Sequence, residues 1–516
     1  MLRFMTGEEK GREGDEIVGS SNIRSFQYGA FDGTTDAAST LYRPAGAMQS
    51  DAEVILRVML ALCNPPYGMA LWHCVRIMSP PEDPVNLFRG WPNPALLPVA
   101  DLLTASGTAL TTPSVYEPGL FYGPDEGYHP LRRHVAEWLT SFYRPAHPIS
   151  EQRICITGGA SQNLACVLQV FTDPVYTRNV WMIAPTYYLA CRIMDDAGFA
   201  GRLRGVPEDD EGIDIAFLTR ELEAAEAMAA VEKNFEPKLK GSRPWKKTYR
   251  HVIYATPTFS NPSMKIMSLR RRESLVRLAR KYDALIVTDD VYDFLQWSSA
   301  PNTTLPEPAK ASIPRLVDVD RYLDGGPKDE WGNVVSNGSF SKLVGPGVRT
   351  GWAEGTEKFT YGLSQTGSSR SGGAPSQLTA TFIDQLLPTS LLQNHILNVL
   401  QPTYSDRYHC LMSAIQQYLL PLGVTLPSKT GEIAGGYFIW ISLPLPLRAD
   451  DIAQRALDEE NLTLAEGELF RVQDDPAENP PSFEHCLRLC FAWEEAGKLA
   501  EGIRRLARVV ERALSR

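Results

Sequence analysis

The chain has 516 residues, of which 43% are hydrophobic, and carries a formal net charge of −10. This length and composition allow a large buried core, and we expect two domains with appendages. The negative charge argues against nonspecific binding of nucleic acid, whose phosphates attract basic surfaces. The eight cysteines are scattered without metal-ligand spacing, which predicts reduced core thiols and no metal site.

The beginning of the chain shows no targeting or membrane-spanning pattern. Residues 1–30 are polar and charged and lack the apolar core of a secretory signal. The apolar run at 54–63 is interrupted by Arg57 and is too short to cross a bilayer. We therefore predict a cytoplasmic protein with no membrane or nucleic-acid partner. An N-terminal extension of unknown role is expected at 1–84, and an N-terminal arm at 85–125.

A large domain is predicted over 126–372, beginning with a helix at 131–142. A short strand at 154–156 then runs into Thr157-Gly158-Gly159-Ala160-Ser161, and a helical pattern follows at 162–171. Small residues where a strand turns into a helix let backbone N–H groups approach a phosphate. The positive end of the helix dipole also favours the anion. The segment is therefore a candidate phosphate site.

Two later strands are each followed by polar residues. The strand at 252–256 leads to an Asn261-Pro262 turn that presents an amide. The apolar run 284–288 ends in Asp289 and Asp290, as expected of a buried parallel strand with polar groups at its carboxyl edge. Open α/β sheets bind ligands at that edge. These side chains are therefore expected to lie close together.

Lys342 lies in the segment 339–349, which follows a strand-like run at 333–336. The segment holds a nucleophilic amine, two serine hydroxyls and a guanidinium, which together can bind an aldehyde covalently and grip a phosphate. A lysine after a serine-rich turn is more often a solvated surface residue. The prediction therefore depends on the matching segments elsewhere in the chain.

The remaining segments complete the predicted layout. Residues 218–250 and 298–331 are rich in charge, and we expect both to be surface excursions. The last part, 373–516, is predicted to hold a connecting helical region at 377–420 and a small C-terminal domain. That domain would contain strands at 435–441 and around Arg488, and a closing amphipathic helix at 496–514.

Taken together and in this order, the segments resemble the class I/II aminotransferase family of fold-type I pyridoxal-phosphate (PLP) enzymes. The resemblance covers residue 86 to the C-terminus, and within the family it points to the fungal branch near 2-aminoadipate and aromatic aminotransferases. It implies an α/β fold with a large, mostly parallel sheet between helices and a smaller C-terminal α+β domain. It also implies PLP as the cofactor and an enzyme of amino-acid metabolism.

The resemblance assigns the chemistry of transamination to a few residues. Lys342 is expected to form the Schiff base with the cofactor aldehyde and later to carry the proton. Burial and nearby positive charge should lower its pKa. Asp289 is expected to lie opposite the pyridine nitrogen and keep it protonated. Tyr292 and Asn261 resemble the donors to the phenolic oxygen. Met264 stands where the family commonly has glycine, and it is strained there if the position needs a positive φ.

The resemblance also implies how the cofactor and the substrate are held. Tyr187 is expected to stack on the pyridine ring, and Arg488 to bind the substrate's α-carboxylate, since a buried arginine requires an anionic partner. Gly90 would let the backbone pass close to the substrate. Tyr122 resembles a tyrosine that reaches the phosphate of the neighbouring subunit, which implies a homodimer with shared active sites. The expected phosphate cup comprises Gly159, Ala160, Ser161, Ser339, Ser341 and Arg349.

The predicted function is the transfer of an amino group from an L-amino acid to a 2-oxo acid. A PLP-dependent lyase that performs β-elimination or carbon–sulfur cleavage would use the same lysine, aspartate and arginine, so the sequence leaves this alternative open. A PLP-binding transcriptional regulator is disfavoured, because residues 1–84 hold few basic residues and no clear helix-turn-helix. The sequence does not identify the amino acid.

Overall fold

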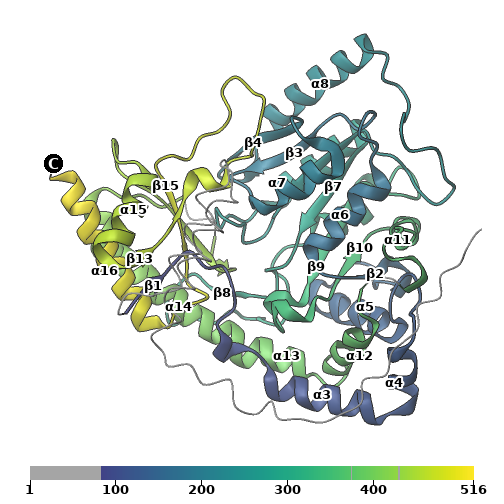
Figure 1. Ribbon diagram of the computed structural model, residues 1–516, viewed down its shortest axis with the longest axis horizontal. Helices are drawn as coiled ribbons and strands as arrows, with labels where there is room; N and C mark the ends of the chain where they lie inside the picture. Colours follow the sequence, from purple (N-terminus) through teal and green to yellow (C-terminus); the bar gives the residue numbers. More distant parts are fainter. Residues whose placement is uncertain (1–82, 373–374, 428–430, 516) are drawn as a thin grey trace, which may run out of the picture. The chain divides into compact units, whose positions relative to one another are not determined.

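The computed structural model describes residues 83–372, 375–427 and 431–515 (Figure 1). The chain divides into two units, Met1–Ser79 and Pro80–Arg516. The first unit lies outside the described residues, as does almost all of the predicted extension at 1–84. None of the helices in the described ranges is both long enough and apolar enough to cross a membrane.

An eight-stranded sheet forms the centre of the described chain, in the order β2-β10-β9-β7-β6-β3-β4-β5. The neighbouring strands β9, β7, β6, β3 and β4 run parallel to one another. Strands β10 and β5 are antiparallel to their neighbours. This mostly parallel sheet confirms the predicted α/β fold. The strand bounds are β2 Ile154–Thr157, β3 Val180–Ala184, β4 Leu203–Asp209, β5 Gly212–Ile213, β6 His251–Ala255, β7 Ala284–Asp289, β9 Val334–Ser339 and β10 Gly351–Glu354.

Helices cover both faces of this sheet, because alternate residues of each buried strand point to opposite sides. In β3, Val180 and Met182 pack in one apolar cluster, and Trp181 and Ile183 in another. The first cluster includes residues of α6 (Ala160–Phe171), α7 (Leu189–Met194) and α11 (Glu357–Ser364). The second includes residues of α8 (Ile215–Val231), α9 (Leu269–Lys281) and α10 (Leu316–Tyr322). The described large domain is therefore an α-β-α sandwich.

The position of α10 corrects the prediction of a surface excursion over 298–331. Leu316 and Val319 of this helix are buried in the core. The charged residues around them are buried too, because Arg315 binds Asp318 through two 3.0 Å contacts and also Glu354 at 2.8 Å. Paired charges can be buried where single charges cannot. Charge composition alone therefore misjudged this segment.

The C-terminal part forms a second, smaller set of elements, seen at one side of Figure 1. An antiparallel sheet, in the order β12-β15-β14, comprises Phe438–Ser442, Cys486–Cys490 and Ala465–Glu466. The predicted strand at 435–441 is interrupted at Gly436, whose φ of 74° is not that of a strand, and β11 (Ile433–Gly435) pairs instead with β8 (Gln296–Ser298). The closing helix α16 spans Ala496–Leu514, as predicted.

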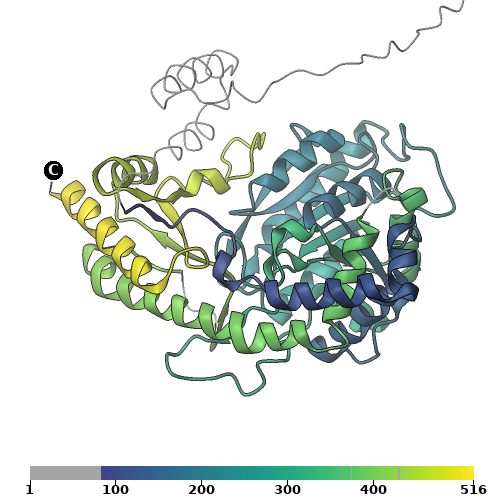
Figure 2. The same ribbon diagram turned by 60° about the horizontal axis from the view of Figure 1, so that its bottom comes forward.

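Other helices and one strand pair connect these parts. The arm strand β1 (Val85–Asn86) pairs in parallel with β13 (Leu462–Thr463), so the start of the described chain joins the C-terminal domain. The predicted helical region at 377–420 is confirmed, and its long helix α14 packs against α16 (Figure 2). The remaining helix bounds are α3 Val99–Thr111, α4 Pro113–Leu120, α5 His129–Tyr143, α12 Gln377–Leu386, α13 Leu391–His395, α14 Gln401–Ala414 and α15 Ala449–Glu460.

Candidate active site

The carboxyl ends of three neighbouring parallel strands carry the predicted catalytic residues. Strand β7 lies between β6 and β9 in the sheet. Asn261 follows β6, Asp289 ends β7, and Lys342 ends the short 3₁₀ turn Phe340–Lys342 that follows β9. Parallel strands place such residues at one edge of the sheet, where ligands bind in open α/β folds.

Lys342 is partly buried, and its Nζ donates to the backbone oxygen of Gly90 at 3.0 Å. The amine also lies 5.8 Å from the centre of the Tyr292 ring and 5.2 Å from that of Tyr437. Burial lowers the pKa of Lys342 to about 8, although the neighbouring Cys490 and Asp289 oppose the shift. The lysine can therefore be neutral at a mildly alkaline pH, in the direction expected of a Schiff-base lysine.

Asp289 is buried with one oxygen bound and one left without a partner. Tyr254 donates to Oδ2 at 2.9 Å, whereas the buried Oδ1 has no hydrogen-bond partner. Burial raises the pKa of Asp289 to about 6, although the Tyr254 hydrogen bond opposes the shift. The carboxyl is thus mostly ionised at pH 7 and has one oxygen available for a cationic donor.

The neighbouring Asp290 has a different role. Its Oδ2 accepts from the hydroxyls of Thr288 at 2.7 Å and Ser336 at 2.5 Å. Burial raises the pKa of Asp290, and the positive charge of the nearby Arg315 opposes this rise. Asp290 therefore belongs to a structural polar network beneath the sheet edge. Both carboxyls keep a buried Oδ1 without a partner, but Asp289 is the one of the two whose charge acts on Lys342, which supports the choice of Asp289 as the candidate for the cofactor's carboxylate.

The predicted phosphate cup comes together at the start of α6. Arg349 Nη2 donates to the backbone oxygen of Gly158 at 2.8 Å, and its Nη1 lies 3.5 Å from the hydroxyl of Ser341. The hydroxyl of Ser339 in turn lies 2.9 Å from that of Ser341. Gly159 has a φ of +95°, and a Cβ there would lie 2.6 Å from Arg349 Nη2. A residue without a side chain is therefore needed for this approach.

The first turn of α6 completes the cup. Gly159 precedes the helix and offers no side chain to cap it, and Ala160 and Ser161 are its first two residues. The N–H groups of a first turn have no partner within the helix, so they can bind an anion. A phosphate dianion fits this set of backbone amides, hydroxyls and one guanidinium.

Arg488 on β15 reaches the same site from the C-terminal sheet. Its Nη1 donates to Asn261 Oδ1 at 2.9 Å and its Nη2 to the oxygen of Phe88 at 2.7 Å, but its buried Nε has no partner. The centres of the Phe438 and Phe470 rings lie 4.0 and 4.6 Å from the guanidinium carbon of Arg488. The ion pairs found among the described residues include none with Arg488. Such a cation can bind a carboxylate.

The other predicted residues lie around this centre. Tyr187 is partly buried near Asp289. Burial raises the pKa of Tyr187 to about 12, and the charge of Asp289 adds to this rise. Tyr292 is buried beside the Lys342 amine. A Cβ at Gly90 would lie 2.8 Å from Phe438, so the backbone does pass closely there. Met264 has a φ of 59°, the left-handed conformation that would strain a residue other than glycine.

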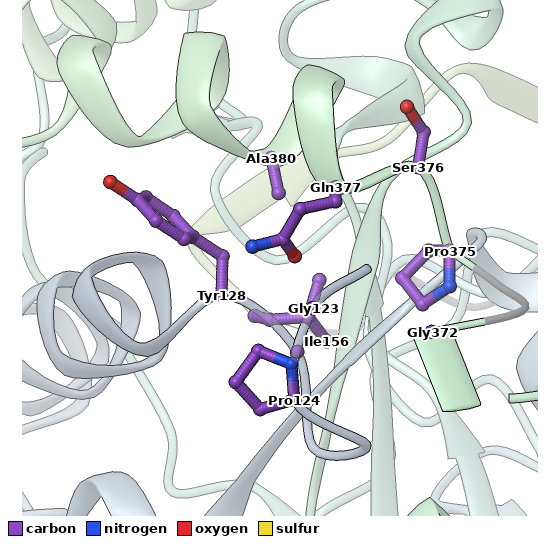
Figure 3. Close-up of a pocket in the computed structure, with 10 residues that line it drawn as sticks. Gly123, Pro124, Tyr128, Ile156, Gly372, Pro375, Ser376, Gln377 and Ala380 are labelled. Carbon is purple, nitrogen blue, oxygen red and sulfur yellow. The ribbon is translucent and has the colours of Figure 1, made fainter. Parts of the chain in front are cut away.

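Tyr122 is 85% exposed, and the contacts found among the described residues place it beside Gly372. Beside it, a cavity of about 10 Å³ is lined by residues that include Gly123, Tyr128 and Gln377 (Figure 3). This volume holds about one water molecule. The cavity is too small for a substrate, and the predicted site residues do not line it.

Two tyrosines of the site were missed by sequence reasoning. Tyr254 binds Asp289, and the Tyr437 hydroxyl donates to the backbone oxygen of Lys342 at 3.3 Å. Each stands in or next to an apolar strand, where a buried phenol needs a hydrogen-bond partner. That requirement was the available signal, but the sequence alone did not say which partner each would find.

The geometry fits PLP on three counts: an available oxygen on Asp289, an uncapped helix start beside Arg349, and a partly buried lysine whose pKa is affected by the charge of Asp289. Comparison with known proteins agrees. The family model described as "Aminotransferase class I and II" matches residues 117–506.

Relatives and solved structures cover most of the chain. An aromatic-amino-acid aminotransferase of Thermococcus litoralis is 27% identical over 84% of this chain and 90% of its own length. A 2-aminoadipate transaminase of Thermus thermophilus is 28% identical over 83% and 90%. The crystal structure of a Pyrococcus horikoshii kynurenine aminotransferase is 25% identical, covers 91% of this chain and all of its own, and gives a TM-score of 0.68. The chain belongs to the class I and II aminotransferase family of PLP-dependent enzymes.

Proposed function

We propose that this PLP-dependent aminotransferase moves an amino group from an L-amino acid to a 2-oxo acid with Lys342 as the proton carrier. When bound, PLP supplies an aldehyde for the amino group and a ring that accepts electrons. The observation that carries the proposal is the pairing of a lysine whose pKa is about 8 with an aspartate that keeps one buried oxygen free.

Each residue has a separate task in this proposal. The Lys342 amine removes a proton from the substrate's Cα when neutral and returns it when protonated. Asp289 holds a proton on the pyridine nitrogen through its free Oδ1. Arg488 fixes the α-carboxylate by its planar fork, and Asn261 holds that fork in place through the 2.9 Å hydrogen bond. Phe438 and Phe470 exclude water from the guanidinium.

The test is Lys342→Ala, with Lys358→Ala as a control. Lys358 pairs with Glu330 on the surface and lies over the Trp331 ring. We expect Lys342→Ala to lose more than about 10³-fold in turnover, as for a general acid–base group, and the control to lose little. Borohydride reduction followed by peptide mapping should place the cofactor on Lys342. Normal turnover by Lys342→Ala, or labelling elsewhere, would contradict the proposal.

The products distinguish transfer from elimination, since both reactions use the same residues. Stoichiometric 2-oxo acid formed from the donor, together with an aminated acceptor, supports transfer. Pyruvate with free ammonia from a β-substituted donor would instead show elimination.

We also propose a homodimer in which Tyr122 completes the partner's phosphate cup. The exposed apolar residues of the arm lie on α3, on α4 and directly after it. Leu103 is 73% exposed, Leu120 63% and Phe121 75%, next to the exposed Tyr122. Monomeric proteins rarely expose so many large apolar side chains together, and a second copy of the chain would bury them.

Mixed dimers test the sharing of the site. Tyr122→Ala and Lys342→Ala are each expected to be nearly inactive alone. In a shared arrangement, one of the two sites of a mixed dimer combines an intact Lys342 with the partner subunit's Tyr122. Random one-to-one reassembly should therefore restore about a quarter of wild-type activity, because half of the dimers are mixed and half of their sites are intact. Absence of rescue, or a monomer in sedimentation, would refute the shared site. A cytoplasmic location is proposed as well, and cell fractionation tests it.

A further inference from the structure

A cavity of about 310 Å³ lies where the chain enters strands β6 and β7, away from Lys342. Two of its lining residues, Arg250 and Asp283, come directly before these strands, whereas the predicted site residues follow or end them. Asp283 and Asp289 are six residues apart. A strand rises about 3.3 Å per residue, so the cavity lies roughly 20 Å from the proposed catalytic groups. Its volume is at the lower end of those of small-molecule sites and suits one compact ligand.

Arg250 and Glu226 form a fixed charged pair in the wall of this cavity. Arg250 Nε donates to Glu226 Oε1 at 2.9 Å, and its Nη1 donates to the backbone oxygen of Tyr176 at 3.0 Å. His251 Nε2 lies 2.9 Å from the same glutamate oxygen. The contacts of the described chain leave Arg250 Nη2 and Glu226 Oε2 without partners. One donor and one acceptor of opposite charge are therefore held in place before a ligand arrives.

The lining adds a second, more exposed pair of opposite charges. Asp283 Oδ1 binds Lys247 at 2.6 Å, and the contacts of the described chain leave its Oδ2 without a partner. Lys281 is paired more loosely, with Glu223 at 3.5 Å, and keeps N–H groups for a ligand. The lining thus holds two carboxylates and two cations. A ligand with a single charge would meet as many like charges as opposite ones, whereas a zwitterion can meet each of its charges with an opposite one.

Aromatic side chains form the apolar part of the lining. Phe235 follows α8 and is 69% exposed, and the centre of the Tyr176 ring lies 4.7 Å from the guanidinium carbon of Arg250. Such rings offer surfaces on which a ligand ring can pack. Asn234, beside Phe235, is buried and donates through Nδ2 to the oxygen of Val175 at 2.8 Å, but its buried Oδ1 has no partner. Because an unsatisfied buried acceptor is unfavourable, an ammonium group in the cavity would supply a missing donor.

We propose that this cavity binds a free amino acid with an aromatic side chain, at a site separate from the one that holds Lys342. The α-carboxylate would meet Arg250 Nη2, the ammonium group Glu226 Oε2, and the ring Phe235. This site is independent of the proposed function, because none of its residues takes part in transamination. It would hold an amino acid that is bound and not converted.

Hydrogen exchange followed by mass spectrometry tests this site in the holoenzyme, because it reports on each segment of the chain separately. L-Phenylalanine is the probe, added without a 2-oxo acid so that turnover does not continue. We expect it to slow exchange in peptides covering 226–235 and 281–283, apart from any effect on 339–349. Phenethylamine, 3-phenylpropionate and alanine each lack one of the three matched groups. They should therefore bind at the cavity at least about fivefold more weakly.

Two substitutions of exposed residues have matched controls. Phe235→Ala should weaken phenylalanine binding at the cavity by about 2- to 10-fold, the usual worth of an aromatic pair. Leu239→Ala should not, because Leu239 is 68% exposed on the same segment but lies outside the lining. Lys281→Gln should weaken binding by about two- to fivefold, as for an exposed ion pair. Lys238→Gln should not, although Lys238 has a similar surface pair with Glu236 at 3.3 Å. All four variants should keep wild-type turnover.

The outcomes separate the cavity from the proposed function. Protection confined to the segments around Lys342 would overturn the second site. Equal affinity of Phe235→Ala and Leu239→Ala for phenylalanine would overturn it too, as would equal binding of phenylalanine and phenethylamine. Each of these results leaves the aminotransferase proposal intact, because turnover and the labelling of Lys342 test it separately. Protection at 226–235 in an enzyme without transaminase activity would instead support the cavity and contradict the proposed function.

Discussion

Tyr254→Phe isolates the effect of one hydrogen bond on Asp289, the carboxylate proposed to bind the cofactor. The substitution removes the hydroxyl that donates to Asp289 Oδ2 at 2.9 Å and keeps the buried ring. Because this hydrogen bond holds down a pKa that burial has raised to about 6, its loss raises the pKa further. A hydrogen bond to a charged group is worth about 1.5–3 kcal/mol, or roughly 1–2 pKa units. The variant's Asp289 should titrate near pH 7–8.

The consequence is a change in how PLP affinity depends on pH. The protonated pyridine nitrogen binds the ionised carboxylate, so affinity follows the ionised fraction of Asp289 in the free enzyme. At pH 6.5 the ionised fraction falls from about three quarters to between about a quarter and a thirtieth, a loss of about 3- to 25-fold. At pH 9 both carboxyls are ionised and the loss should be below about twofold. The titration of PLP itself affects both proteins equally.

The assay is titration of apoenzyme with PLP, followed by tryptophan fluorescence, at half-unit steps from pH 6 to pH 9. Tyr249→Phe is the control, because Tyr249 is equally buried but donates to the backbone of Gly332 at 2.6 Å. The control should keep the wild-type pH profile. A ratio of wild-type to Tyr254→Phe affinity that stays constant over this range would refute the reasoning.

Three further predictions concern the same site. Capture of PLP by apoenzyme should accelerate as pH rises through about 8, since the neutral Lys342 amine is the proposed nucleophile. Stopped-flow absorbance measures the capture rate, and a midpoint near pH 10.5 would contradict the prediction. Gly159→Ala should weaken PLP binding by about tenfold or more, because a Cβ meets Arg349 at 2.6 Å, whereas Gly107→Ala on α3 should not. Asp289→Asn should stabilise apoenzyme at pH 8 by about 3 kcal/mol, since a pKa raised from 3.8 to about 6 is about 2.2 units at 1.36 kcal/mol each. That advantage should grow from about pH 4 to pH 6 in denaturant unfolding and then stay constant.

The sequence predicted the elements that local pattern determines. Apolar runs ending in polar residues marked β6 and β7, and their common edge followed from parallel pairing. The amphipathic repeat at 496–514 marked α16 with the bounds observed. These predictions were confirmed because side-chain periodicity and strand order can be read from residues that are close together in the sequence.

The predictions failed where contacts between residues distant in the sequence determine burial or the role of a side chain. The burial of Arg315 depends on Glu354, which is distant in sequence and close only in the fold. The role of Tyr254 depends on an aspartate 35 residues later, on the neighbouring strand.

The protein holds a set of uncompensated polar groups at one edge of its sheet, and this arrangement explains why the site needs its ligands. Asp289 Oδ1 and Arg488 Nε are buried without partners, and each such group costs about 1–3 kcal/mol. Cofactor would satisfy the aspartate, and the substrate's α-carboxylate would satisfy the arginine. The fold tolerates this cost because α-β-α packing buries large apolar clusters on both faces of the sheet. Binding energy is therefore concentrated on groups that only the correct ligands can satisfy, so the apoenzyme should be measurably less stable than the loaded enzyme.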